Sequence, residues 1–349
     1  MRPILCRRLL LVLLGLGVIF AAALSRPAAA IEVEEIGSFH IGGHKVTLTG
    51  LPMREGVFTA GGPLRVADPN GDFQVEQMYV QYVKLANPKA RYPLLMWHGG
   101  GMTGAMWESK PDGRPGWQSF FLRAGHDVYL SDAVERGRAS WARYPEIWTE
   151  PFFRSENEAW DIFRIGPLKS YQTDPERRVG FPDGRFPLAF YDQFMKQLVP
   201  RWATNDAAIQ TAYDQLVQRV CPCVIIMFSQ GGNFGFGAAL HAPDKVKAVI
   251  GIEPSGAPDP AKSNVTAMKG IPHLFVYGDH LDVSDFWKQM VANVRRYQEM
   301  LAAQGGVADV LDLPKLGIKG NTHAMMMDNN SDQIAELIQE WMNKQNLMK

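Results

Sequence analysis

One stretch decides the fold of this chain: VIIMFSQGG, which runs from Val224 to Gly232. Its apolar first half is typical of a strand that is buried on both faces of a sheet. Ser229 follows directly, and the glycines after it allow the backbone to turn sharply into a helix, which holds the serine hydroxyl in the open. A nucleophile of acyl transfer occupies such a position, but Ser-x-Gly-Gly also occurs in ordinary turns. Two further stretches bear on the choice between these interpretations.

The first of them is WHGGG, from Trp97 to Gly101, at the end of another apolar run. Three successive glycines leave their backbone N–H groups unshielded, and in hydrolases a His-Gly-Gly-Gly loop donates to the oxyanion of a tetrahedral intermediate. A glycine-rich turn without chemistry is the alternative. We interpret His98 as a hydrogen-bonded anchor of this loop rather than as a base. The candidate oxyanion donors are the N–H groups of Gly99, Gly100, Gly101 and Gln230.

The second is NTH, from Asn321 to His323, which precedes an amphipathic C-terminal helix. A histidine after the last strand can lean over the serine and act as its base. Its neutral imidazole needs an acidic partner, which fixes the tautomer and stabilises the imidazolium that forms when Ser229 attacks. The sequence therefore predicts a third, acidic member of the site.

Two acids compete for that role. Asp282 follows a predicted strand at 274–277, which is the usual position of the acid in such triads. Glu253 ends the apolar run that begins at Val246, where an unpaired carboxylate would cost several kcal/mol of desolvation, so we expect it to have a partner. The residues themselves leave both candidates open.

Strands and helices alternate along most of the chain, which indicates an α/β fold with a mostly parallel central sheet and helices on both faces. The ligand site of such a sheet lies at the carboxyl ends of its strands, where all three stretches fall. Residues 141–202 interrupt the alternation and are rich in aromatics and prolines. We predict that they form a cap insertion over an apolar pocket, the alternative being a second packing layer. Predicted strands cover 46–48, 74–83, 94–97, 126–130, 224–228, 246–252, 274–277 and 309–313, and predicted helices cover 117–124, 206–219, 233–241, 285–304 and 331–346.

The N-terminus has the three parts of a secretory signal peptide: arginines, an apolar run from Leu9 to Leu24, and a small-residue site that ends at Ala30. We expect cleavage there, which leaves residues 31–349 as one periplasmic or secreted domain without stable membrane insertion; an uncleaved anchor is the alternative. The removed segment holds four arginines and no acid, so the net charge becomes about −4. The absence of a basic stripe argues against nucleic acid as a partner.

Cys221 and Cys223 flank Pro222 just before the serine strand. Export makes a disulfide between them chemically feasible, but residues two apart on an extended strand usually lie too far apart at Cα to be bridged without distortion. We therefore expect packing cysteines. The eight histidines of the chain show no spacing typical of a zinc site, and we expect neither a metal nor a cofactor.

Six motifs, read in order, resemble an atypical group of secreted bacterial α/β-hydrolase esterases, and the likeness covers most of the chain beyond Ile36. The resemblance implies an α/β-hydrolase fold and a homodimer. In that group the acid is a glutamate after the sixth strand, which corresponds to Glu253, so Asp282 becomes a loop acid near the site. Met227 departs from the general pattern, because Gly-x-Ser-x-Gly has a glycine there. The motifs are WHGGGMTGAMWE (97–108), DGR (112–114), RGRAS (136–140), IEP (252–254), FVYGDH (275–280) and GNTHAMMM (320–327).

The expected function is that of a serine carboxylesterase, which hydrolyses small-molecule esters through an acyl-enzyme formed on Ser229. His323 would be the base and Glu253 its acid. The same triad serves amidases, lactonases and polyester depolymerases, since its geometry does not name the bond that is cleaved. From a different class, a non-catalytic binding protein with a hydrolase fold is the alternative. Loss of the serine, the histidine or the glycine loop would have favoured it.

Overall fold

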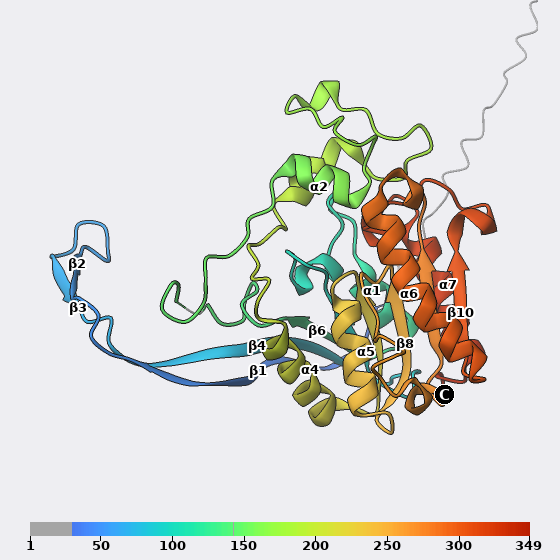
Figure 1. The fold of residues 1–349 in the computed structure, drawn as a ribbon, viewed down its shortest axis with the longest axis horizontal. Helices are drawn as coiled ribbons and strands as arrows, with labels where there is room; N and C mark the ends of the chain where they lie inside the picture. Colours follow the sequence, from blue (N-terminus) through green and yellow to red (C-terminus); the bar gives the residue numbers. More distant parts are fainter. Residues whose placement is uncertain (1–29, 142) are drawn as a thin grey trace, which may run out of the picture. The chain divides into compact units, whose positions relative to one another are not determined.

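An eight-stranded sheet forms the centre of the computed structural model, which describes residues 30–141 and 143–349 (Figure 1). The predicted signal peptide, residues 1–30, thus lies outside the described residues except for Ala30. Residues Ile31–Lys349 form one compact unit. Within the described ranges, no helix combines the length and the hydropathy that crossing a membrane would need.

The strand order across the sheet is β1-β4-β6-β5-β7-β8-β9-β10. β4 is antiparallel to both of its neighbours, and every other neighbouring pair is parallel. This is the α/β-hydrolase fold that the sequence predicts. The strands are β1 (Val33–Leu48), β2 (Arg54–Gly56), β3 (Arg65–Ala67), β4 (Gly71–Leu85), β5 (Leu94–Trp97), β6 (Val128–Asp132), β7 (Cys223–Phe228), β8 (Val246–Ile252), β9 (His273–Tyr277) and β10 (Ala308–Asp312).

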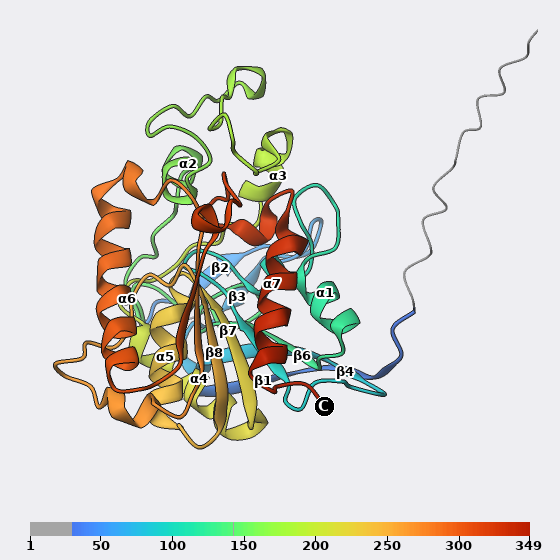
Figure 2. The same cartoon turned by 90° about the vertical axis from the view of Figure 1, so that its right-hand side faces the viewer.

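Helices cover both faces of the sheet (Figure 2). Because side chains alternate along a strand, Met96 of β5 packs with α1 and α7, while Trp97 packs with α4, α5 and α6 on the opposite face. The helices are α1 (Trp117–Ala124), α2 (Glu156–Phe163), α3 (Tyr191–Met195), α4 (Asp206–Val220), α5 (Gly231–His241), α6 (Asp285–Ala303) and α7 (Ser331–Lys344). Short 3-10 helices lie at Gly104–Trp107, Pro175–Arg177, Leu188–Phe190, Val265–Met268, Leu281–Val283, Leu313–Leu316 and Met325–Met327.

The first strand differs most from the prediction. β1 begins at Val33, well before the predicted start at residue 46, and pairs with β4 along its whole length. β4 pairs with β6 only over Tyr79–Val83, so the rest of the β1–β4 ladder is a two-stranded ribbon, with the small β2–β3 hairpin in its connection. Most residues of β1 are at least partly exposed, and the strand therefore lacks the apolar alternation from which strands are predicted.

The expectation that Cys221 and Cys223 are unbridged is wrong, because the structure joins them by a disulfide. The two residues do not share an extended strand. Cys221 is the residue that ends α4, and Cys223 is the first residue of β7, so the chain turns at Pro222 and brings the Cα atoms within 4.3 Å. The spacing rule fails here because it assumes extended backbone between the cysteines.

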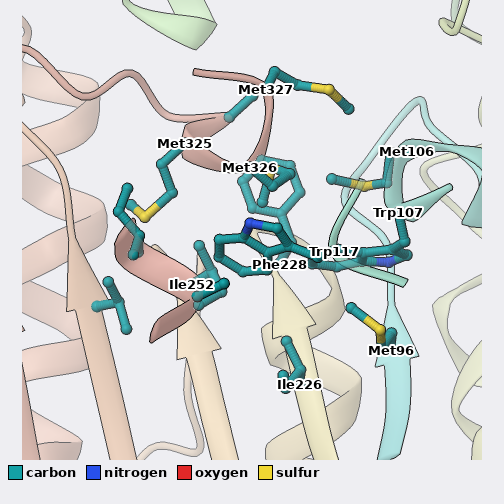
Figure 3. Close-up of a cluster of buried hydrophobic side chains, with 14 of the residues drawn as sticks. Met96, Met106, Trp107, Trp117, Ile226, Phe228, Ile252, Met325, Met326 and Met327 are labelled. Atoms are coloured by element: carbon teal, nitrogen blue, oxygen red, sulfur yellow. The ribbon is translucent and has the colours of Figure 1, made fainter. Parts of the chain in front are cut away.

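A buried apolar cluster supports the carboxyl end of β7 (Figure 3). Phe228, the residue before Ser229, belongs to the same cluster as Met325, Met326 and Met327, which form a 3-10 helix with at most 1% of each residue exposed. The sequence suggested either pocket lining or core packing for these methionines. The structure places them in the core, where they support the loop that carries His323.

Candidate active site

Ser229 lies in the sharp turn between β7 and α5. Its φ is +51°, a left-handed conformation that residues other than glycine rarely adopt. Two backbone hydrogen bonds fix it: Ser229 N–H donates to Ile252 O at 3.1 Å, and Ser229 O accepts from the N–H of Ser255 at 3.0 Å. A Cβ at Gly231 would lie 2.8 Å from His98 O, and one at Gly232 would overlap Pro254. The glycines after the serine are therefore required by the close approach of neighbouring chain.

Met227 takes the position where a glycine is usual, and a glycine of the following helix makes room for it. A Cβ at Gly235 of α5 would overlap Met227 Sδ. The Met227 side chain thus occupies space that the absence of a side chain at Gly235 leaves open. The turn at Ser229 forms in spite of the larger side chain.

Glu253 and His323 are joined by a hydrogen bond of 2.6 Å between Oε2 and Nδ1, and each residue is only 1% exposed. Because Nδ1–H donates to the carboxylate, the second ring nitrogen, Nε2, remains an acceptor. Asp282, the other candidate acid, lies exposed in the 3-10 helix Leu281–Val283 and makes no hydrogen bond to His323. Of the two acids, the structure brings Glu253 to the histidine.

Arg164 is the partner that Glu253 was expected to have. Its Nη1 donates to Oε2 at 2.9 Å and its Nη2 to Oε1 at 2.5 Å, while the N–H of Gly278 donates to Oε1 at 2.7 Å. Arg164 ends α2 with a φ of +55°, and its Nε donates to Asp279 O at 2.8 Å. Sequence reasoning missed this residue. The single signal was a lone arginine in an otherwise apolar run, between Phe163 and Ile165.

The charges of these groups set the protonation of the pair. Burial alone would raise the pKa of Glu253, but the Arg164 guanidinium and the hydrogen bond from His323 outweigh it, and the pKa lies below its ordinary value. Burial, together with the charges of Arg164 and Arg154, lowers the pKa of His323 to about 4 in spite of the opposing effect of Glu253. Near neutral pH the site therefore holds a carboxylate beside a neutral imidazole, as a base requires.

Aromatic rings hold the imidazole in place. The His323 ring packs against Phe228 and Trp287, with ring centroids 4.5 Å and 4.2 Å away, and the backbone N–H of His323 donates to Phe163 O at 3.0 Å. The preceding residue is fixed by Asp328, which accepts from the backbone N–H and the hydroxyl of Thr322 at 2.8 and 2.9 Å. The ring is thus positioned by packing on its faces and by hydrogen bonds along its backbone.

The glycine loop lies beside the serine. His98 anchors it as predicted: its Nδ1 bonds Gly99 O at 2.8 Å, and its Nε2 accepts from the N–H of Ala133 at 3.0 Å. A Cβ at Gly99 would lie 3.1 Å from Ser229 Cβ. Among the residues that the structure describes, the N–H groups of Gly100 and Gln230 have no acceptor. They are free to donate to a ligand.

A pocket of about 410 Å³ brings the predicted residues together. Gly100, Ser229, Gln230 and His323 line it, and Glu253 lies behind His323. No hydrogen bond joins Ser229 Oγ to His323 Nε2 in this structure, and such contacts often tighten only when substrate binds. The remaining lining comes from residues 141–202, from α6, from the first residues of α4 and α5, from the end of β7 and from the loop after β8: Arg154, Glu158, Ile162, Phe163, Arg201, Asp206, Phe228, Asn233, Ser255, Phe286, Trp287 and Met290.

One group of potential metal ligands lies among the described residues, and it is separate from the pocket lining. Asp183, Asp279 and His280 place one ligand atom each within 4.8 Å of one another. These atoms already have protein partners, since His280 Nε2 bonds Asp183 at 3.0 Å and Asp279 accepts from the N–H of Gly320 at 3.0 Å. The group fastens residues 181–184 to the loop after β9.

No protein-family model matches the chain. Among curated proteins it is similar to the probable secreted lipase phiG of a fungal species, strain ATCC 74256, with 27% identity over 79% of this chain and 88% of that protein. Among solved structures it is similar to one described as the atomic-resolution structure of a novel bacterial esterase. That likeness has a TM-score of 0.79 and 30% identity, and it covers 91% of this chain and 98% of that chain.

Proposed function

Because the chain belongs to the α/β-hydrolase esterases, we propose that it is a serine carboxylesterase whose nucleophile is Ser229. The observation that carries the proposal is the buried hydrogen bond of 2.6 Å between Glu253 and His323, behind a pocket that Ser229 also lines. A buried acid that fixes the tautomer of a neutral histidine prepares Nε2 to accept a proton. The relatives' names, an esterase and a secreted lipase, agree with ester hydrolysis by an exported protein.

The reaction would proceed in two steps. His323 Nε2 takes the proton from Ser229 Oγ as the oxygen attacks the ester carbonyl, and the N–H groups of Gly100 and Gln230 stabilise the oxyanion. His323 then protonates the departing alcohol. In the second step His323 activates a water molecule, which attacks the acyl-enzyme and releases the acid. Glu253 stays ionised throughout, because its buried charge is balanced by Arg164 and stabilises the imidazolium.

The triad alone does not exclude amides, lactones or exported polyesters as substrates. Carboxylic esters are the first substrates to test, since apolar side chains from α2 and α6 form part of the pocket wall. The pocket has room for a short acyl chain beside Ser229, in contact with the side chains of Phe163, Phe286, Trp287 and Met290. The 141–202 segment supplies part of this wall and is proposed to act as the cap.

The test compares Ser229→Ala with Ser255→Ala, since both serines line the same pocket. Wild type and S255A should hydrolyse p-nitrophenyl butyrate and react with an alkyl fluorophosphonate, with the added mass located on Ser229. S229A should do neither, because no other residue would provide the nucleophile. Undiminished turnover by S229A, or a label on Ser255, would remove the mechanism.

A further inference from the structure

Two arginines of the 141–202 segment face the pocket beside Ser229. Phe152 and Arg201 form an antiparallel bridge, in which Phe152 N–H donates to Arg201 O at 2.7 Å and Arg201 N–H donates to Phe152 O at 3.0 Å. In extended chain, residues two apart and residues that pair across a bridge share one face. Arg154 therefore lies on the same face as Arg201, and both side chains line the pocket.

The Arg201 guanidinium lies directly against the glycine loop. The N–H of Val199 donates to Gly101 O at 2.9 Å, which fixes this part of the segment on the loop. A Cβ at Gly100 would overlap Arg201 Nη1. The lack of a side chain at Gly100 is therefore what allows the guanidinium to approach the candidate oxyanion donors.

Arg201 has almost no protein partner for its charge. Its side chain makes one hydrogen bond to a described residue, from Nη1 to Gln230 Oε1, and at 3.4 Å it is long for a bond of this kind. No carboxylate of the described residues lies within 4.0 Å of the guanidinium. Since a guanidinium carries five N–H donors, most of them are available to a ligand.

The neighbouring charged groups do not neutralise Arg201. Arg154 pairs with Glu158 at 3.5 Å, and the Glu158 side chain is 50% exposed, so this ion pair is weak. Asp206 lines the pocket, but it accepts from Gln230 Nε2 at 3.4 Å rather than from Arg201. Arg136 is buried nearby and adds a further positive charge; burial first and then the charge of Arg201 lower its pKa to about 10.

The arginines also mark the place where two pockets meet. A second pocket of about 270 Å³ shares Arg154, Glu158 and Arg201 with the first, and it continues to the apolar side chains of Phe152 and Val199. A ligand with its carbonyl carbon at Ser229 can thus place a second polar group at the guanidinium groups. The fork of Arg201 suits a planar group that accepts two hydrogen bonds.

We propose that Arg201, with Arg154 beside it, binds a carboxylate of the substrate, and that this site therefore selects half-esters of dicarboxylic acids, in which a free acid lies a few atoms from the ester carbonyl. The proposal rests on the proposed function, because it names the substrate class of the same site. A direct contribution of Arg201 to the oxyanion is the competing role. The experiments below distinguish the two.

The first experiment measures binding without catalysis. The inactive S229A chain is titrated by calorimetry at low ionic strength with monomethyl glutarate, which is an anion, and with dimethyl glutarate, which is neutral. We expect the anion to bind at least about tenfold more tightly, as a charge-assisted hydrogen bond predicts, and S229A/R201Q to lose this preference. S229A/R201K keeps the positive charge but lacks the two-pronged guanidinium, so its preference for the anion should lie between those of S229A and S229A/R201Q. Equal dissociation constants for the two esters in S229A would overturn the proposal.

The second experiment measures turnover of p-nitrophenyl hydrogen glutarate and p-nitrophenyl valerate, whose acyl chains have the same length. The ratio of their kcat/KM values should fall about tenfold in R201Q, mainly through KM of the half-ester, and should stay unchanged in R123Q, which removes an exposed arginine of α1. An equal loss on both esters would assign Arg201 to the oxyanion instead. Failure of the wild type to hydrolyse either ester, with the binding preference intact, would refute the proposed function and leave the carboxylate site.

Discussion

Glu253 carries a negative charge where water does not reach it, and three neighbours make that tolerable. The Arg164 fork, the N–H of Gly278 and the ring of His323 together satisfy both carboxylate oxygens. From the sequence it follows that a carboxylate at the end of an apolar strand needs a partner. The sequence does not tell which residue is that partner, because Arg164 lies 89 residues from Glu253 and only the folded chain brings the two together.

The protonation of His323 leads to a prediction about pH. In the proposed mechanism His323 must be neutral to accept a proton from Ser229, so we expect activity to fall as pH drops through the pKa of this histidine in the free enzyme. Burial lowers that pKa to about 4, against an ordinary 6.5. We expect kcat/KM on a neutral p-nitrophenyl ester to keep most of its value at pH 5.5 and to show an acidic midpoint below pH 5. Initial rates between pH 4 and 8 check this.

The control for that profile is return of the enzyme to pH 7 after brief exposure to each pH, which separates titration from unfolding. A reversible midpoint at or above pH 6.5 would contradict the assignment, since it would mean that His323 behaves like an exposed histidine.

The packing between β7 and α5 depends on the close contact of Met227 with Gly235. Met227 fills the space that Gly235 leaves open on α5. Gly235→Ala should destabilise the fold by about 1–3 kcal/mol through overpacking. Met227→Ala should cost about 2–5 kcal/mol through the cavity it leaves. Each change relieves the other, so the double variant should lose less free energy of unfolding than the two single losses added together.

Urea unfolding of the three variants measures these free energies. Gly270→Ala is the matched control, since a Cβ at this exposed glycine would meet nothing within 4 Å; its effect should stay within about 0.5 kcal/mol. Strict additivity of the Met227 and Gly235 changes would show that the two positions do not share the space.

The elements that the sequence predicts correctly are those with a strong pattern. Apolar runs of strand length between amphipathic stretches predict β5, β8 and α1 at their observed bounds. β1 is missed over much of its length because its pairing is set by β4 and not by burial. The Cys221–Cys223 bridge is missed because a proline turn, which spacing does not reveal, brings the two together. Ser229, His323 and the glycine loop could be proposed from the sequence because each comes after a recognisable strand. Arg164 and Arg201 could not, because neither follows such a pattern.

For the whole molecule, buried titratable groups predict how stability depends on pH. Burial lowers the pKa of His98, His273 and His323 to about 4, so between pH 4 and 6.5 the unfolded chain binds protons on them that the folded chain does not. Asp328 acts in the opposite direction, because burial raises its pKa to about 6. An excess of about two protons remains on the unfolded chain, and the free energy of unfolding should rise with pH by up to about 2.7 kcal/mol per unit near pH 5.

Urea titrations at half-unit intervals from pH 4.5 to 7.5 measure this slope, with the m-value held as a check that the unfolding transition keeps its character. A flat dependence below pH 6 would show that the buried histidines titrate as they do in the unfolded chain.

The ion pair between Arg164 and Glu253 connects the end of α2, a helix that lines the pocket, to the acid that bonds His323. Any hinge motion that swung α2 outward would withdraw the guanidinium and strand a carboxylate in dry protein, at a cost of several kcal/mol. We therefore expect α2 to keep its place in the pocket wall during turnover. Turnover should accordingly respond to the concentration of dissolved monomers and show no jump when the substrate begins to form droplets.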